Sequence, residues 1–198
     1  MGDRLEDRIG RIHAALGAAV EKDMAALPAT VSRTPRMIFF CQDFSGGQNQ
    51  AELDNLAHSL IYNVAHLYDH LRKWAKTHDR DPDQVDQKVK QCTALQIVCD
   101  LSNVDKHGGH GRTTWSGRKL SLTDVTRVLR LTTRPEKGSR VAARLGRIPV
   151  VSGDGTAEGV LTGQVLDENG GAVGDLHKVV CAAVAAWECL LEEWGVIS

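Results

Sequence analysis

The sequence predicts a mainly helical α+β protein: a four-helix bundle with a β-rich, basic insertion between the third and fourth helices. Apolar residues recur at steps of three and four over four long segments, which is the period of an amphipathic helix. Between the last two segments Thr, Val, Gly and Arg dominate, as is typical of strands and tight turns. A chain of 198 residues can bury one good-sized core, so we expect a single domain over 1–198.

Start and stop signals delimit the expected helices. Pro28 ends the first, Asp83 caps the third, and Asp175 caps the fourth. The third ends at Gly108-Gly109. Only a short break separates the second helix from the third, so these two should run antiparallel. The segment 28–48 has no regular period and is expected to form an irregular crossing over the bundle. The helices are expected at about 3–27, 49–78, 83–107 and 175–195.

The insertion is expected at about 112–172. Leu120 to Thr133 has the composition of a strand, with a short helix as the alternative. Glu168-Asn169-Gly170-Gly171 is a tight-turn signal, which favours a hairpin at that point. Further strands are expected at 148–152 and 160–167.

The formal net charge of −1 hides an uneven distribution of charge. Between Gly111 and Val150 ten Lys or Arg stand against two acids, a local charge of +8. The rest of the chain has 14 basic and 23 acidic residues. Such segregation is typical of a surface that binds a polyanion, or of two parts of one fold that attract each other.

Cysteine spacing and hydropathy indicate the cellular setting. Cys92 and Cys99 are seven apart, and Cys181 and Cys189 eight apart, so we expect all four to be small core residues on helix faces. The sequence contains no C-x-x-C pair, the spacing that would indicate a zinc or redox site. No apolar run approaches the ~20 residues that span a bilayer, and the charged N-terminus lacks the apolar centre of a secretory signal. We therefore expect a cytoplasmic protein without a membrane partner.

The second and third expected helices each carry a polar stripe beside the apolar one. Both stripes have the same spacing, with steps of four, three and four residues. Antiparallel pairing would bring Asn63 level with Asp100 and form one polar seam. The seam is either a functional site or a hydrogen-bond network that fixes the helix register. The stripes consist of Ser59, Asn63, His66 and His70, and of Gln96, Asp100, Asn103 and His107.

The run from Lys106 to Gly111 joins a lysine, two imidazoles and a flexible backbone at a helix end, followed by Arg112. It can hold a phosphate, or it can be a solvated helix C-terminus with a glycine turn. As catalytic groups we expect His107, with Asp100 fixing its tautomer and raising its pKa. The expected ligand-binding residues are His58, Ser59, Asn63, His66, Asn103, Lys106, His110 and Arg112.

A metal site at His66 and His70 is an alternative, and a cofactor is not expected. His66 and His70 are four apart and can clasp a metal with a third ligand, but no H-E-x-x-H occurs. We expect His13 and His177 to be surface residues. Signatures for nucleoside triphosphates, dinucleotides and serine hydrolases are absent, because no G-x-x-x-x-G-K, G-x-G-x-x-G or G-x-S-x-G occurs.

Two resemblances bear on function. Long helical bundles with an Arg, a few residues and then a His resemble the HEPN superfamily, and here the pair is Arg72 and His78 in Arg-Lys-Trp-Ala-Lys-Thr-His. The resemblance implies acid–base cleavage of RNA by that pair, usually across a dimer interface. The helix end Asn103-Val-Asp-Lys-His107 also resembles that of a group of bacterial bundle proteins, which implies no activity.

The sequence therefore predicts a HEPN-like bundle that binds or cleaves RNA or a nucleotide. The alternatives are a non-catalytic interaction protein, which forms a homodimer or docks a partner, and a metal-binding bundle. Asp79, Asp81, Asp83 and Asp86 surround the Arg72/His78 end and would repel RNA. The Asn103 to His110 end is thus the expected polyanion-facing surface.

Overall fold

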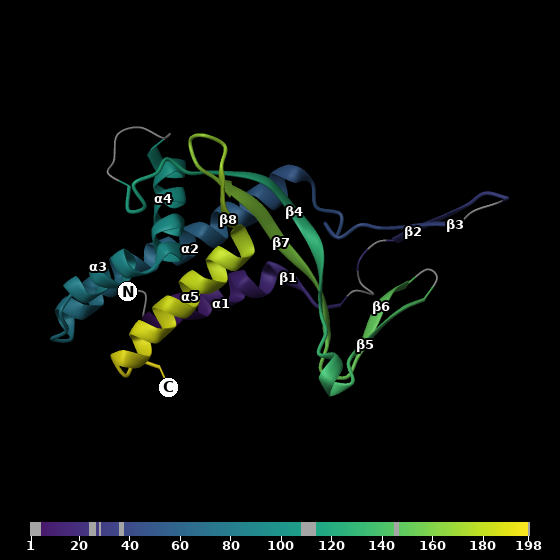
Figure 1. The fold of residues 1–198 in the computed structure, drawn as a ribbon. Coiled ribbons are helices and arrows are strands. Elements are labelled where there is room, and N and C mark those ends of the chain that lie inside the picture. Colours follow the sequence, from purple (N-terminus) through teal and green to yellow (C-terminus); the bar gives the residue numbers. More distant parts are fainter. Residues whose placement is uncertain are drawn as a thin grey trace.

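The computed structural model describes residues 5–23, 27, 29–35, 38–107, 114–144 and 147–197. In this part of the chain, five helices pack against a four-stranded antiparallel sheet. Figure 1 shows the helices gathered on one side, with the long strands β4 and β7 crossing above them and continuing away from the helical body. Two shorter hairpins, β2–β3 and β5–β6, also extend away from the helices.

The starts and ends of the helices agree with the predicted signals except at two places: the first helix ends at Ala18, well before Pro28, and the third is broken. A capping box holds the start of α2, in which Asn49 and Glu52 exchange side-chain and backbone hydrogen bonds. Asp175 accepts a hydrogen bond from the backbone N–H of Lys178 and so caps α5. The third expected helix divides at Cys92, whose φ of −115° and ψ of 105° are extended. The helices are α1 (Leu5–Ala18), α2 (Gln50–Thr77), α3 (Asp83–Gln91), α4 (Thr93–His107) and α5 (Leu176–Glu193).

The sheet is built on one central strand. β7 pairs along one edge with β4, and along its other edge with β1 near Val160 and with β8 near Val165. The expected irregular crossing at 28–48 is instead the β2–β3 hairpin, so that prediction is wrong. The strands are β1 (Val20–Glu21), β2 (Ala29–Arg33), β3 (Ile38–Gln42), β4 (Ser121–Thr132), β5 (Arg140–Arg144), β6 (Arg147–Ser152), β7 (Thr156–Leu166) and β8 (Ala172–Asp175).

The predicted four-helix bundle is wrong, because the sheet forms part of the hydrophobic core. Val125, Leu161 and Val165 are buried in the same cluster as Leu60 of α2 and Trp187 of α5. The strands from 121 to 175 are thus not an insertion beside a finished bundle. Without these strands, the apolar faces of α2 and α5 would be exposed to water. This exposure costs a free energy of about 25 cal/mol for each Å² of apolar surface.

Candidate functional site

A cavity of about 760 Å³ lies where α2 and α4 meet the start of β4 and the turn between β7 and β8. Its volume falls in the range of about 300–1,000 Å³ found for small-molecule sites. Two buried helical residues and one half-buried residue of α4 contribute to the apolar wall, and β4 supplies the rest. The lining residues are His58, Ile61, Leu101, Val104, Lys119, Leu120, Ser121, Leu122, Asp167 and Glu168.

Asp100 fixes the segment that leads into the cavity. Its side chain is 1% exposed. One carboxylate oxygen accepts a hydrogen bond from the backbone N–H of Trp115 at 2.8 Å. The other accepts from the backbone N–H of Ser116 at 2.8 Å and from its hydroxyl at 2.6 Å. This carboxylate therefore ties the 114–116 segment to α4, and the chain continues from there into the cavity wall at Lys119.

The turn between β7 and β8 forms the opposite, acidic side of the cavity. Oδ1 of Asp167 accepts hydrogen bonds from the backbone N–H groups of Asn169 and Gly171. Gly170 has a φ of 76°, a conformation that glycine adopts without strain. Oε2 of Glu168 accepts from the backbone N–H of Lys119 at 3.1 Å, which fastens the turn to the start of β4. Each carboxylate has a second oxygen that can accept a hydrogen bond from a ligand.

The lining divides by chemistry. Ile61, Leu101, Val104, Leu120 and Leu122 offer an apolar surface, while the polar members carry one ammonium, one imidazole, one hydroxyl and two carboxylates. A few polar groups at the rim of an apolar cavity orient a ligand, and the apolar wall provides the binding energy. This lining suits a ligand with a flat or apolar body and a polar end that bears hydroxyl or anionic groups.

Of the predicted ligand-binding residues, His58 lines the cavity. The others on α2 lie elsewhere: Ser59 is exposed, Asn63 is half-buried, and His66 stacks on the ring of Tyr62 with the ring centroids 3.8 Å apart. Tyr62 is itself 45% exposed, so this stack faces outward.

On α4, Asn103 is half-buried, and Gln96 donates a hydrogen bond to the carbonyl of Lys90 at 2.8 Å. Asp100 accepts its hydrogen bonds from the 114–116 segment. The described contacts of the two stripes are therefore with different neighbours and do not form the predicted polar seam. The expected role of Asp100 in orienting His107 stays a prediction, because the side chain of His107 is not among those described. The side chains of Lys106 and His107, and all of His110 and Arg112, lie outside the described residues.

The Arg72/His78 pair is not assembled within the described chain. Arg72 donates to both carboxylate oxygens of Asp86 at 2.9 Å and to the hydroxyl of Tyr68 at 2.8 Å. His78 stacks on Trp74 at 4.1 Å between ring centroids, and its Nδ1 lies 2.9 Å from the carbonyl oxygen of Trp74. The two side chains face different neighbours. Burial, followed by the hydrogen bond to Asp86, raises the pKa of Tyr68, so this cluster keeps a neutral phenol.

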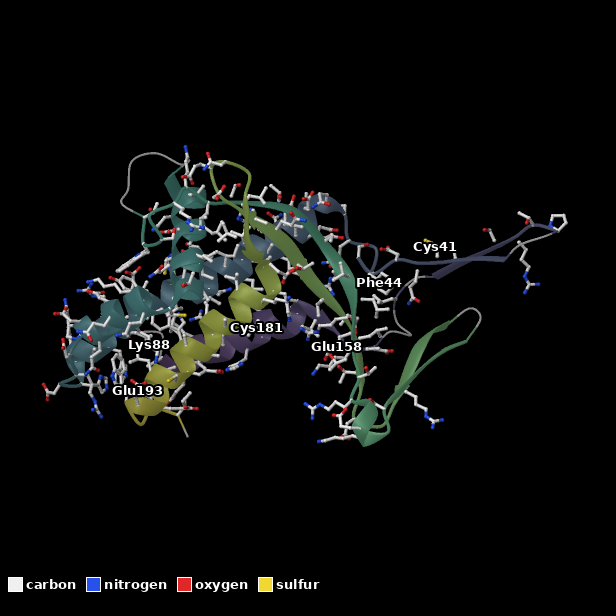
Figure 2. All side chains as sticks on the ribbon, viewed as in Figure 1. Cys41, Phe44, Lys88, Glu158, Cys181 and Glu193 are labelled. Atoms are coloured by element: carbon white, nitrogen blue, oxygen red, sulfur yellow. The ribbon has the colours of Figure 1, made fainter. Side chains whose placement is uncertain are left out.

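A second polar cluster lies between α5 and the sheet, and no motif in the sequence predicts it. His177 is 8% exposed, so its prediction as a surface residue is wrong. Nη1 of Arg130 lies 2.6 Å from Nε2 of His177, and Nη2 donates to Glu158 at 2.7 Å. Figure 2 labels Glu158 on the sheet and Cys181 on α5. Because arginine only donates, Nε2 of His177 must be the acceptor.

The protonation of this cluster argues against nucleophilic catalysis. Burial, followed by the charge of Arg130, lowers the pKa of His177. Sγ of Cys181 lies 3.6 Å from Nε2 of His177, and local burial raises the pKa of the thiol. A neutral thiol beside a neutral imidazole lacks the thiolate that cysteine chemistry needs. The cluster therefore serves to join α5 to the sheet.

Cysteine burial also departs from prediction. Cys99 is buried and Cys92 half-buried, whereas Cys181 and Cys189 are exposed.

Among the described residues no group of three or more His, Cys, Asp or Glu side chains is arranged to hold a metal ion. Within the same part of the chain, no helix has both the length and the apolar character to cross a bilayer. No protein-family model, curated protein or solved structure matches the chain.

Proposed function

We propose that the protein binds a mononucleotide in the cavity between α2, α4 and the start of β4. The observation that carries the proposal is the lining: an apolar wall with Lys119, His58, Asp167 and Glu168 among its polar members. A base is flat and largely apolar on its faces, so it suits the wall formed around Leu122. The cavity volume of about 760 Å³ can take a ligand of this size.

The polar members divide the recognition of such a ligand between them. The ribose hydroxyls donate to the free carboxylate oxygens of Asp167 and Glu168, in the way that an acidic residue binds ribose in dinucleotide sites. The phosphate oxygens accept a hydrogen bond from the ammonium of Lys119 and a second one from the imidazole of His58. Because Lys119 is exposed, its contribution is at the low end for a charge-assisted hydrogen bond.

Isothermal titration with adenosine, guanosine, cytidine and uridine monophosphates tests the proposal. Lys119→Ala should weaken nucleotide binding about tenfold, because one charge-assisted hydrogen bond is lost. Arg118→Ala is the matched control, since Arg118 is an exposed neighbouring cation that does not line the cavity. Absence of heat with all four monophosphates at millimolar concentration would refute the proposal.

The binding of RNA along the β4–β7 ribbon is a second candidate, favoured by exposed cations at its far end. Arg134, Lys137 and Arg140 are exposed there, with Lys137 at 3.6 Å from Asp154. If their contacts are with backbone phosphates, fluorescence anisotropy should show affinity falling steeply with salt. The double variant Arg134→Ala/Arg140→Ala should make that dependence shallower. Both candidates concern binding, and neither uses Arg72, which forms an ion pair with Asp86.

A further inference from the structure

Three reactive side chains meet where α3 passes the C-terminal end of α5. Nζ of Lys88 lies 3.2 Å from Sγ of Cys189 and 3.3 Å from Oε1 of Glu193. Sγ of Cys189 lies 3.2 Å from the same carboxylate oxygen. Figure 2 shows Lys88 and Glu193 close to each other at this end of the molecule. The three atoms thus form a compact triangle that joins helices about a hundred residues apart in sequence.

The charges within the triangle support each other. Burial pulls the pKa of Lys88 down, but the hydrogen bonds with Cys189 and Glu193 outweigh it, and the net shift is upward. The hydrogen bond from Cys189, followed by that from Lys88, lowers the pKa of Glu193. Glu193 is therefore an ionised carboxylate that accepts hydrogen bonds from the thiol and from the ammonium, and that ammonium can attract negative charge that develops on sulfur during oxidation.

Accessibility completes the requirements for oxidation. Cys189 is exposed, so a small oxidant can reach its sulfur. Cys181 is exposed on the same helix, but its neighbour is the imidazole of His177 rather than an amine. Of the two exposed thiols on α5, Cys189 is the one whose sulfur contacts a primary amine, that of Lys88.

We propose that Lys88 and Cys189 form a redox modification site, at which hydrogen peroxide leads to a covalent sulfenamide bond between Nζ and Sγ. In the first step the sulfur attacks peroxide: an S–O bond forms, the O–O bond breaks, and the thiol becomes a sulfenic acid with release of water. The departing hydroxide takes up the thiol proton, by way of the carboxylate of Glu193.

In the second step the amine of Lys88, after giving its extra proton to solvent, attacks the sulfenic sulfur. The N–S bond forms, the S–O bond breaks, and hydroxide leaves with the second nitrogen proton as water. The product has lost two hydrogens relative to the reduced protein, and the peroxide has been reduced to two waters. The bond ties α3 to α5 in the wall of a groove that Lys88 lines together with Gln84 and Trp194.

Mass spectrometry of the full chain treated with peroxide tests the site. The background carries Cys41→Ser and Cys181→Ser, which removes the other exposed thiols as disulfide partners. The expected result is a loss of two hydrogens per chain, with peptide mapping that joins the peptide of Lys88 to that of Cys189. Dithiothreitol should reverse the change.

Matched variants separate a cross-link from simple oxidation. Lys88→Arg keeps the positive charge but provides a poor nucleophile, so the joined peptide should disappear while Cys189 is still oxidised. Glu193→Gln should slow formation of the joined peptide several-fold. Restoring Cys181 provides an internal control, which should give no peptide linked to a lysine. Stable sulfinic acid at Cys189, or an unmodified thiol, without any joined peptide would overturn the proposal.

Discussion

Replacing Asp100 by alanine is the sharpest test of how the cavity wall is held. The 1% exposed carboxylate accepts three hydrogen bonds, two of them from the backbone of Trp115 and Ser116. A hydrogen bond to a charged group contributes about 1.5–3 kcal/mol, and a buried donor left without an acceptor costs about 1–3 kcal/mol. The hydroxyl of Ser116 can turn toward other acceptors, but the two backbone donors cannot. We therefore expect Asp100→Ala to lower the free energy of unfolding by about 3–5 kcal/mol.

Urea unfolding followed by circular dichroism measures this loss, and it should shift the midpoint without changing the slope. Ser116→Ala is the comparison, because it removes one of the three donors and should cost about 1 kcal/mol. A thermal scan of Asp100→Ala should show a Tm lower by roughly 10 °C for a domain of this size. A cost below about 1 kcal/mol for Asp100→Ala, or equal costs for both variants, would contradict the anchoring role.

Two further predictions concern the other polar clusters. Arg72→Ala should lower the free energy of unfolding by only about 1 kcal/mol, because the side chains of Arg72 and Asp86 are 33% and 21% exposed and solvent screens the ion pair. Chemical unfolding measures this loss, with Lys73→Ala as the control. The pKa of His177 is lowered below its ordinary 6.5, so the unfolded chain binds this proton first as pH falls. The stability that neutral His177 contributes is therefore present above pH 6.5 and is lost as the pH falls through the pKa of His177 in the folded protein. In unfolding experiments at a series of pH values, His177→Gln should make the free energy of unfolding less dependent on pH in this range.

Helices with strong local signals could be predicted from the sequence, and α2 is the best example. Its expected range of 49–78 agrees with the observed Gln50–Thr77, because the capping box and the apolar seam are both local. The break at Cys92 has no Gly or Pro to mark it, and the apolar stripe continues through it. β1 has only two residues and gives no pattern of its own.

The role of the sheet could not be predicted, because β7 does not alternate where it enters the core. Its residues from Gly159 to Leu161 are buried in succession. A continuous apolar run can belong to a buried strand or to a helix segment, and periodicity alone does not distinguish them. A strand is expected at 160–167, but no local pattern shows that it packs against α2 and α5, so the sequence predicts an insertion beside a complete bundle.

For the candidate cavity, sequence reasoning singled out one lining residue, His58, and one residue beside it, Asp100, but few of the contacts there. His58 was predicted and lines the cavity. Asp100 was singled out, but its partners Trp115 and Ser116 follow it by 15 and 16 residues with no motif between them. Lys119 and Glu168 are 49 residues apart and meet because the β4–β7 pairing brings them together. Contacts of that separation leave no local pattern in a single sequence.

The most direct test of the central claim is a titration of the isotope-labelled protein with adenosine monophosphate, followed by backbone amide chemical shifts. If the cavity between α2 and α4 is the binding site, the amides of Lys119, Ser121 and Glu168 should shift together and saturate on one binding curve. Those of Arg80 and Cys181, which lie outside the cavity lining, should stay unchanged. Shifts confined to other residues, or none at millimolar nucleotide, would contradict the assignment of this cavity as a nucleotide site.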